Sequence, residues 1–244
     1  METVNDLLNY NKLKIIQNSE WFSFSLDSVL LANFVKINKN TKIIDFCSGN
    51  APIPLFLSTK TKQSIIGVEL QKEVYDLGKR SIELNGLQDQ LFLLNEDVKN
   101  INKLFETDSF DLITCNPPYF KLNNIKNINE NQIKAKARHE ISLNIEDIFK
   151  TAKKILKNNG KIALINRTDR LVEVIIEMRK NNIEPKRLKF IYPFKNSISN
   201  LFLIEGSKNG KSGLKVENSL IVHDKSGNYT KEVQDIFNGG THEN

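Results

Sequence analysis

The stretch that decides the fold class is KIIDFCSGNAPIPLFL, at residues 42–57. A short apolar run ends in an acid and a turn that contains Gly49. Pro52 and Pro54 then stand where the first turn of a helix tolerates proline. A strand, a tight turn and a helix form the repeating unit of an α/β protein, so we predict that a parallel sheet begins here.

The rest of the chain continues this alternation of strands and helices. Near-continuous apolar runs, typical of parallel strands buried on both faces, occur at 65–68, 91–94, 110–114 and 162–165. Helical patterns occupy 71–84 and 145–156, and another begins at Thr168. We therefore predict a Rossmann-like, doubly wound α/β fold with right-handed crossovers.

Two regions lie outside the alternation. Residues 21–35 are strongly apolar, and Ser25 or Asp27 is placed to cap a helix there. After residue 186, the segments 188–192, 200–205 and 219–223 have the pattern of paired antiparallel strands. No break in composition marks a boundary, so we predict one domain over 1–244. It would comprise a helical extension (1–40), a cofactor-binding and catalytic core (41–206) and a C-terminal extension (207–244).

Composition excludes several classes of protein. The 244 residues carry a net charge of +6, which is compatible with a nucleic-acid partner. Two cysteines exclude a disulfide-rich scaffold and a four-cysteine zinc site, and the three histidines lack ligand spacing, so we expect no metal. No apolar run approaches the ~18 residues of a membrane span, and the start lacks a signal-peptide pattern. We expect a cytoplasmic protein with free thiols and no membrane partner.

Polar residues follow successive predicted strands at their carboxyl ends, where ligands bind in open α/β sheets. They are Asp45, Gly49, Glu69, Asp97 and Asn116. The alternative for each residue alone is that it caps a helix or forms a turn. The regular recurrence of polar groups at strand ends favours a binding site.

The spacing of Gly49 and Glu69 indicates an adenosine-containing cofactor. Glu69 follows Gly49 by twenty residues, which places a carboxylate where it accepts both ribose hydroxyls. Alternatively, Glu69 is a helix-capping acid, because the next predicted helix opens at Gln71. A loop with one glycine disfavours a pyrophosphate, which needs close backbone approach. S-adenosylmethionine contains adenosine but no phosphate, and we predict it as the cofactor.

The segment Asn116–Pro117–Pro118–Tyr119 suits methyl transfer to a conjugated amino group. Two acceptors, the Asn116 side-chain oxygen and the Pro117 carbonyl, would localise the nitrogen lone pair. The prolines stiffen the loop, and Tyr119 offers a ring on which a flipped base stacks. The alternative is a rigid turn in which Tyr119 only packs.

The motifs described above, together with other segments of the chain, resemble those of a known family. DFCSGNAPIP, GVEL, NEDV and CNPPYF resemble the successive motifs of class I amino-methyltransferases. QNSEWFSFSLDSVLLANFV (17–35), KARHE (136–140) and SLIVHDKSGNYTKEVQDIF (219–237) resemble the bacterial tRNA1(Val) adenine N6-methyltransferases. The resemblance implies a mostly parallel seven-stranded sheet with an antiparallel C-terminal hairpin. It also implies methylation of N6 of adenine 37 in the anticodon loop of a tRNA.

The resemblance also implies a role for individual residues. Those expected at the cofactor are Phe24 and Asp27 (methionine half), Asp45 and Gly49 (loop), Glu69 (ribose), Asp97 and Val98 (adenine), and Asn116. Those expected at the target base are Asn116, Pro117 and Tyr119. Cys47 and Asn50 depart from the pattern, because glycine is usual at both positions. We interpret Cys47 and Cys115 as small buried apolar residues.

The stretch that follows Tyr119 is rich in Lys and Asn. Lys121, Lys134, Lys136 and Arg138 lie in it, and we expect these cations to bind RNA phosphates. The alternative is a solvated loop that reflects the biased composition.

Other activities stay open. An adenine N6-methyltransferase for another RNA or for DNA would share the motifs, but a DNA enzyme usually needs a further recognition domain. A protein-glutamine N5-methyltransferase also uses this tetrapeptide, but it usually carries a helical domain before the core, and about 40 residues are too few for one. A nicotinamide-dependent dehydrogenase would need GxGxxG, which is absent. A non-catalytic RNA-binding module would not need an intact Asn–Pro–Pro–Tyr.

Overall fold

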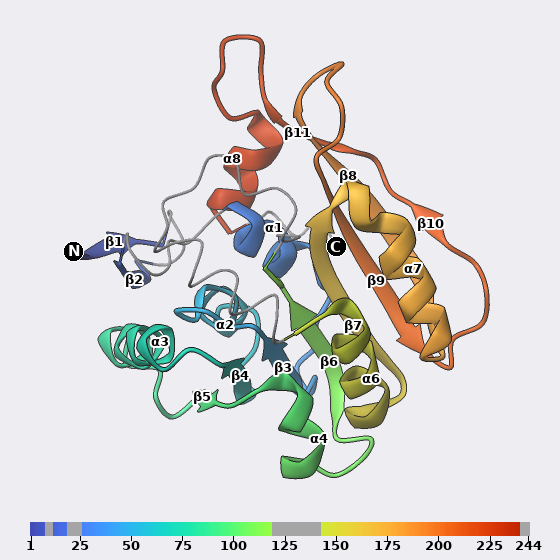
Figure 1. Ribbon diagram of the computed structural model, residues 1–244. Helices are drawn as coiled ribbons and strands as arrows, with labels where there is room; N and C mark the ends of the chain where they lie inside the picture. Colours follow the sequence, from blue (N-terminus) through green and yellow to red (C-terminus); the bar gives the residue numbers. More distant parts are fainter. Residues whose placement is uncertain (8–11, 19–25, 119–142, 240–244) are drawn as a thin grey trace.

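A nine-stranded sheet forms the centre of the computed structural model, which describes residues 1–7, 12–18, 26–118 and 143–239 (Figure 1). Its strand order is β10-β8-β9-β7-β6-β3-β4-β5, and β11 pairs with β8. The strands are β3 (Ile43–Phe46), β4 (Ile65–Glu69), β5 (Leu91–Asn95), β6 (Phe110–Cys115), β7 (Leu156–Arg167), β8 (Ile183–Phe194), β9 (Leu201–Lys208), β10 (Lys215–Val216) and β11 (Leu220–His223). Strands β3 to β7 pair in parallel, which confirms the predicted α/β sheet.

Helices cover both faces of this sheet. One apolar cluster joins it to α1 (Leu26–Phe34), α2 (Pro52–Ser58), α3 (Lys72–Leu84) and α8 (Lys231–Phe237). A second joins its other face to α4 (Ile101–Leu104), α6 (Ile145–Ile155) and α7 (Leu171–Lys180). Short 3₁₀ turns, η1 (Val98–Asn100) and η3 (Thr168–Arg170), precede α4 and α7. Adjacent strand residues face opposite ways, so Ile43 belongs to the first cluster and Ile44 to the second.

Helix α6 shows how the sequence sets its own boundaries. The Asn144 side chain accepts a hydrogen bond from Asp147 N at 2.8 Å, as predicted for an N-cap. Two acids occupy the first turn and two lysines the last, which complements the helix dipole. The apolar positions all fall on the buried face: Ile145, Ile148, Phe149, Ala152 and Ile155.

The seven expected strands are present as β3 to β9, and two short strands that were not expected extend the sheet to nine. The hairpin of β8 and β9 is antiparallel as predicted. However, β10 and β11 both pair with β8 in parallel, so the expected antiparallel pairing of 219–223 was wrong. β9 ends beside the start of β8, where Lys208 pairs with Ile183, so the chain turns around there and β10 runs in the direction of β8. They cover backbone groups that an edge strand otherwise leaves unpaired.

The N-terminal extension is only partly helical, which corrects the expectation for 1–40. β1 (Glu2–Asp6) and β2 (Lys14–Asn18) form an antiparallel sheet of their own. β2 is attached to α3, because Ile16 N donates to Ser81 Oγ at 3.0 Å and Lys14 N to Asn85 Oδ1 at 2.8 Å. Strand β2 was not predicted, because a segment of five residues carries too little pattern to distinguish it from the rest of the extension.

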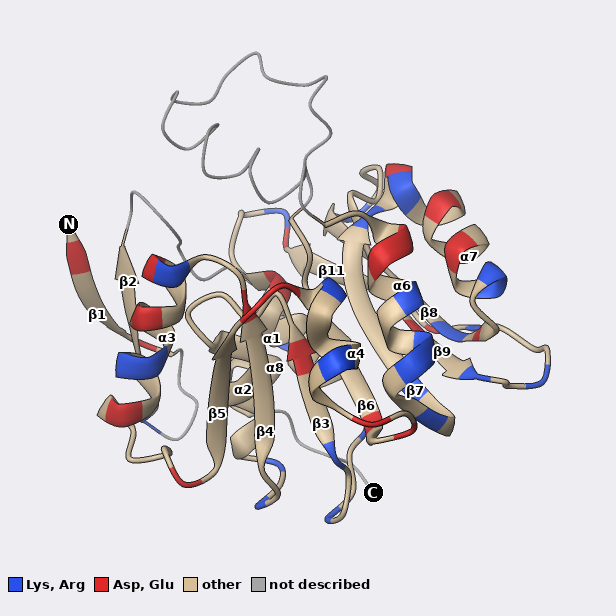
Figure 2. Cartoon of the chain, turned by 60° about the horizontal axis from the view of Figure 1, so that its bottom comes forward, with Lys and Arg blue, Asp and Glu red and all other residues tan. Residues whose placement is uncertain are grey.

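The chain reverses direction in the sheet between β3 and β6. From β3 it proceeds through β4 to β5 on one side, and β6 then returns to the other side of β3. In open α/β sheets, ligands bind beyond the carboxyl ends of the strands at such a switch point. Figure 2 shows acidic residues gathered at these ends of the strands.

Candidate active site

The switch point brings three predicted site segments together. Phe46 pairs with Val68 of β4 and with Cys115 of β6. The loop after β3, Glu69 and Asn116 therefore follow directly from paired positions on three adjacent strands. The sequence predicted this convergence from the order of the strands alone.

Asp45 lies inside the protein, beneath the loop. It is fully buried and accepts hydrogen bonds from Ser48 Oγ and Thr114 Oγ1, both at 2.6 Å. Burial raises its pKa to about 7, although both hydroxyl hydrogen bonds act in the opposite direction. Asp45 thus ties β3, β6 and the loop together and supports the site from below.

The loop after β3 turns tightly although it contains one glycine. Cys47, Gly49 and Ala51 have positive φ values of 57°, 58° and 71°. Two of these are not glycine, and the left-handed region costs such residues free energy. The departure at Cys47 therefore leaves the turn intact, and neighbouring groups must hold it in place.

Glu69 supplies one of these supports. It is 2% exposed, its Oε2 accepts from Gly49 N at 2.9 Å, and its Oε1 accepts from Gln71 N at 2.8 Å. One carboxylate thus holds the loop and the start of α3 together. The alternative of a helix-capping acid accounts for one oxygen, and the contact with the loop is a second function. Its predicted contact with a ribose stays a prediction.

Two glycines outside the loop make room for it. A Cβ on Gly78 of α3 would lie 3.2 Å from Gly49 O and 3.3 Å from the Asn50 carbonyl carbon. A Cβ on Gly67 of β4 would lie 2.5 Å from Ser48 Oγ. Sequence reasoning missed both functions, although a glycine on the buried face of a helix indicates close packing.

Asp97 and Val98 lie beyond the end of β5, as predicted. Asp97 caps η1, its Oδ1 accepts from Lys99 N at 2.9 Å, and its side chain is 20% exposed. Val98 is buried. Asn95, at the end of β5, pairs with Glu69 at the end of β4. The Asp97 carboxylate, two residues beyond Asn95, therefore lies at the same edge of the sheet as Glu69.

Asn116 is half-buried at the end of β6, and Pro117 beside it is buried. Asn116 Nδ2 donates to Ser28 Oγ, 3.4 Å away on the first turn of α1. Because the amide nitrogen faces Ser28, the amide oxygen is the atom with which Asn116 can accept from an amino group. Ser28 is adjacent to Asp27, so α1 brings a predicted cofactor residue to the same place.

Two buried amides at this edge were not predicted as functional. Asn166, near the end of β7, lies two residues beyond Leu164, which pairs with Cys115. It is fully buried, and no described residue accepts from its Nδ2. Asn50 Nδ2 donates to Ile16 O at 2.7 Å, which fastens the loop to β2. This contact explains why asparagine stands where glycine is usual.

Several predicted site residues lie outside the described residues. They are Phe24, Tyr119, Lys121, Lys134, Lys136 and Arg138, together with the capping candidate Ser25. Their predicted roles stay predictions.

The interpretation of the two cysteines as small buried residues is confirmed for Cys115 and only partly for Cys47. Cys115 is fully buried at the end of β6, and Cys47 is half-buried in the loop. A hydrogen bond with Cys115, together with burial, raises the pKa of the Cys47 thiol well above its ordinary value. A raised pKa disfavours the thiolate, which is the nucleophilic form.

The donors and acceptors at this edge fit an adenosine-bearing cofactor without a phosphate. Glu69 and Asp97 provide carboxylates that accept from hydroxyl and amino groups, and the loop 45–54 contains no Lys or Arg to balance a phosphate. Among the described ranges, no group of three or more His, Cys, Asp or Glu is arranged to hold a metal ion. Within those same ranges, no helix has the length and apolar character needed to cross a membrane.

Comparison with known proteins adds a family and several relatives. The model of the methyltransferase small domain family matches residues 13–186. The tRNA1(Val) (adenine(37)-N6)-methyltransferase of Shewanella woodyi is 25% identical over 222 residues, which cover 88% of this chain and 90% of that protein. Proteins of the same name from Photobacterium profundum and Porphyromonas gingivalis are 25% and 23% identical, covering 85% and 93% of this chain and 86% and 91% of their own lengths.

Solved structures share the fold. A predicted O-methyltransferase from Agrobacterium tumefaciens has a TM-score of 0.69 at 21% identity and covers 87% of this chain and 96% of its own. Geranyl diphosphate C-methyltransferase from Streptomyces coelicolor has a TM-score of 0.57 at 11% identity, covering 74% and 76%. At these identities the likeness concerns the fold.

Proposed function

The chain belongs to the methyltransferase small domain family, and from this premise we propose that it methylates N6 of adenine 37 in the anticodon loop of a tRNA, with S-adenosylmethionine as methyl donor. The observation that carries the proposal is Asn116–Pro117 at the switch point, beside the loop held by Glu69. The curated relatives named for tRNA1(Val) span nearly the whole chain and favour that tRNA as the substrate.

The residues at the edge of the sheet divide between cofactor and substrate. Glu69 and Asp97 would hold the ribose and the adenine of the cofactor, and the Gly49 loop would lie beneath it. The bound cofactor supplies an electrophilic methyl group. Asn116 Oδ1 and the Pro117 carbonyl would accept from the two hydrogens of the target amino group. This localises a lone pair that conjugation otherwise withdraws into the ring.

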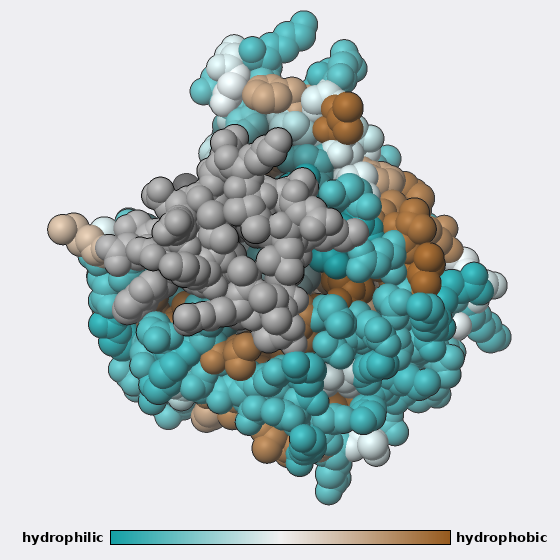
Figure 3. Space-filling view, viewed as in Figure 1, coloured by the Kyte–Doolittle hydropathy of each residue, from teal (hydrophilic) through white to brown (hydrophobic). Residues whose placement is uncertain are grey.

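A second surface at the same edge supports an RNA substrate. Phe194 is the last residue of β8. Because β7 and β8 are both antiparallel to β9, they run in the same direction, and Phe194 lies at the same edge of the sheet as the carboxyl end of β7. Phe194 and Tyr229 are 46% and 43% exposed, and His223 lies between them with ring centroids 5.3 and 5.1 Å away. Figure 3 shows hydrophobic residues among hydrophilic ones at the top of the view. Exposed aromatic rings stack on bases with little regard to sequence.

Methyl transfer to unmodified tRNA1(Val) transcripts tests the proposal. We expect tritiated methyl groups to enter the transcript with adenine at position 37 and not one with guanine there. Equal labelling of both transcripts, or labelling only of DNA or of a protein glutamine, would assign the activity to one of the alternatives.

Asn116→Ala tests the mechanism. It removes one preorganised acceptor, so single-turnover methylation should slow by ~10²–10³ while RNA affinity changes little. Asn218→Ala is a matched control, because Asn218 is an exposed asparagine away from the site. A wild-type rate for Asn116→Ala would exclude the proposed role of the amide.

The basic stretch after Tyr119 calls for a separate measurement. Neutralising Lys134, Lys136 and Arg138 should reduce the dependence of RNA affinity on salt, because fewer counterions are released. Cofactor affinity should stay nearly constant with salt. An unchanged slope would favour the alternative of a solvated loop.

A further inference from the structure

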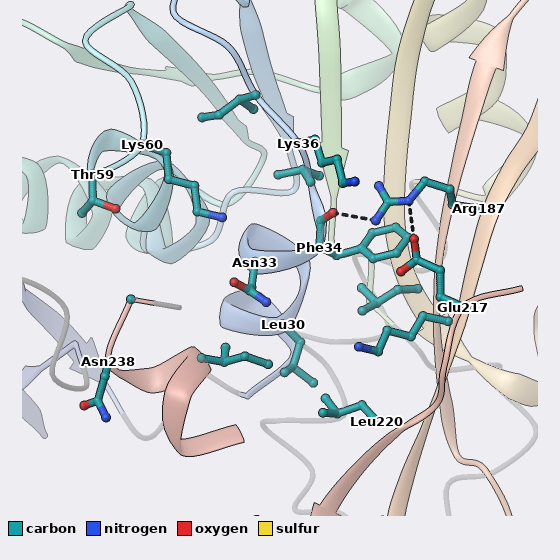
Figure 4. A pocket seen from close by; sticks show the side chains of 16 residues that line it. Leu30, Asn33, Phe34, Lys36, Thr59, Lys60, Arg187, Glu217, Leu220 and Asn238 are labelled. Atoms are coloured by element: carbon teal, nitrogen blue, oxygen red, sulfur yellow. Dashed lines mark hydrogen bonds and ion pairs between the residues drawn. The ribbon is translucent and has the colours of Figure 1, made fainter. Parts of the chain in front are cut away.

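A cavity of about 800 Å³ lies away from the candidate active site (Figure 4). It is enclosed by the last turn of α1, the residues after α2, helix α8, and strands β8, β9 and β11. Small-molecule sites commonly have volumes of roughly 300–1,000 Å³. The cavity therefore has the size of a ligand site, and the methyl-transfer chemistry does not account for it.

Helix α1 separates the cavity from the active site. Its first turn carries Ser28, which contacts Asn116, whereas Leu30 and Phe34 in the rest of the helix line the cavity. Phe34 lies six positions after Ser28, which corresponds to about 9 Å along the helix. A ligand in this cavity would therefore occupy a site distinct from that of the cofactor and the target base.

The lining of the cavity is strongly basic. Four cations line it, Lys36, Lys60, Arg187 and Lys189, against one carboxylate, Glu217. Arg187 is balanced by Glu217 and by Glu205, 2.7 and 3.2 Å away, and Lys189 by Glu232 at 3.0 Å. Among the described residues, no carboxylate lies within 4 Å of the ammonium group of Lys36 or Lys60. Neither lysine therefore forms an ion pair with a described carboxylate, although the charge of Lys36 is close enough to Glu217 to help lower the pKa of that carboxyl.

Lys60 is the more informative of the two. It is half-buried, and its Nζ donates to Ala32 O at 2.7 Å, near the end of α1. Burial lowers its pKa to about 8. A cation at a helix C-terminus is an ordinary arrangement, but it uses one of the three ammonium donors. No described residue accepts from the other two, and because Lys60 lines the cavity and is only half-buried, these two donors are available to a ligand.

The surroundings of Lys60 indicate an anion with an organic body. Figure 4 shows Asn33 from α1 close to Lys60, with Asn238 from the end of α8 on the same side. Amide groups bind hydroxyl and phosphate oxygens. The opposite wall carries Leu220 of β11, and Ile236 of α8 adds a further apolar surface. A phosphate offers several acceptor oxygens to an ammonium and an amide together, whereas the apolar walls suit a sugar or base.

We propose that this cavity binds a small phosphate ester of about the size of a nucleoside monophosphate, with its phosphate at Lys60 and Asn33. The proposal does not depend on the methylated substrate. It assigns the protein a second ligand site, at the end of α1 opposite the catalytic edge. The semi-enclosed position of Lys60 favours a free nucleotide over the backbone of a folded RNA.

Calorimetric titration with AMP tests the proposal. The protein is first saturated with S-adenosylhomocysteine, so that AMP cannot bind through the adenosine site. We expect AMP to bind, inorganic phosphate to bind more weakly, and adenosine not to bind. Lys60→Met keeps the length of the side chain and removes the charge, and it should weaken AMP binding at least ~10-fold. Lys62→Met, at an exposed lysine two residues away, should leave the affinity unchanged.

Several results would overturn the proposal. They are absence of AMP binding, equal affinity for adenosine and AMP, or equal effects of Lys60→Met and Lys62→Met. Binding of a 5′-phosphorylated trinucleotide but not of AMP would assign the cavity to an RNA end instead. Should Lys60→Met fail to fold, Asn33→Leu provides the same test from α1. Failure of S-adenosylhomocysteine to bind would count against the proposed methyltransferase function and not against this site.

Discussion

Glu69→Gln separates the two functions that the structure and the sequence give to one carboxylate. Glu69 accepts two backbone N–H groups, Gly49 N at 2.9 Å and Gln71 N at 2.8 Å. A glutamine has one oxygen, so one of these N–H groups would face an NH₂ donor. Leaving a buried donor unsatisfied costs about 1–3 kcal/mol, and making the other bond neutral costs about another 1 kcal/mol.

The expected loss of unfolding free energy is therefore about 2–4 kcal/mol. For a chain of this size it lowers Tm by about 5–15 °C, which differential scanning fluorimetry resolves. If Glu69 also holds the ribose, loss of the charge should weaken S-adenosylhomocysteine binding by about 10- to 100-fold in calorimetry. Glu73→Gln is the matched control, because Glu73 is exposed in the first turn of the same helix.

The two measurements give distinct outcomes. A lower Tm with unchanged cofactor affinity would keep the loop contact and remove Glu69 from the ribose site. Wild-type values for both would refute the reasoning, because a carboxylate with two buried backbone donors cannot be replaced by an amide without cost. Equal effects of Glu69→Gln and Glu73→Gln would show that negative charge near the start of α3, not the contact with the loop, is responsible.

Three further predictions follow from particular contacts. The pKa of Asp45 is raised from 3.8 to about 7 in the folded chain. Between these pH values the folded chain keeps a proton on Asp45 that the unfolded chain has lost. The free energy of unfolding should therefore fall by up to about 4 kcal/mol as pH rises through that window. Asp45→Asn should remove this part of the pH dependence, measured by urea unfolding between pH 4 and 8. Gly78→Ala should destabilise the fold by about 1–3 kcal/mol and weaken cofactor binding, because its Cβ would press on the Gly49 backbone, whereas Lys79→Ala should do neither. Tyr229→Ala should weaken tRNA binding by about 1–3 kcal/mol in filter-binding assays and Tyr229→Phe should not, and equal losses would exclude stacking.

The sequence predicted those parts of the fold that depend on local pattern. The apolar runs predicted at 65–68, 91–94 and 110–114 lie in β4, β5 and β6, and Asn144 caps its helix as expected. The strands β10 and β11 could not be predicted in this way, because two to four residues carry little periodicity and the direction of pairing depends on which edge of the sheet they join. Likewise, β7 begins at Leu156, within the segment expected to be helical, because pairing with β6 takes over there.

The same division applies to the candidate site. The positions of Glu69, Asp97 and Asn116 could be predicted, because each lies at or just beyond the end of a strand; their roles stay predictions. The contacts that support them could not, because they join residues distant in sequence. Thr114 to Asp45 spans 69 positions and Asn116 to Ser28 spans 88. No pattern within a single element reports contacts of this kind.

The glycine-poor loop after β3 illustrates how a departure from a motif can be compensated elsewhere. Cys47 and Ala51 adopt left-handed φ values, at roughly 1–2 kcal/mol each. Glu69 to Gly49 N and Asn50 to Ile16 O are two of the hydrogen bonds that hold the loop in this shape, and each contributes about 1 kcal/mol or more. The room that the turn needs comes from Gly78, which lies on another element. Gly49 thus provides a glycine within the loop, and Gly78 provides a second one on the helix that packs against it. A count of glycines within the loop therefore does not decide whether the tight turn can form.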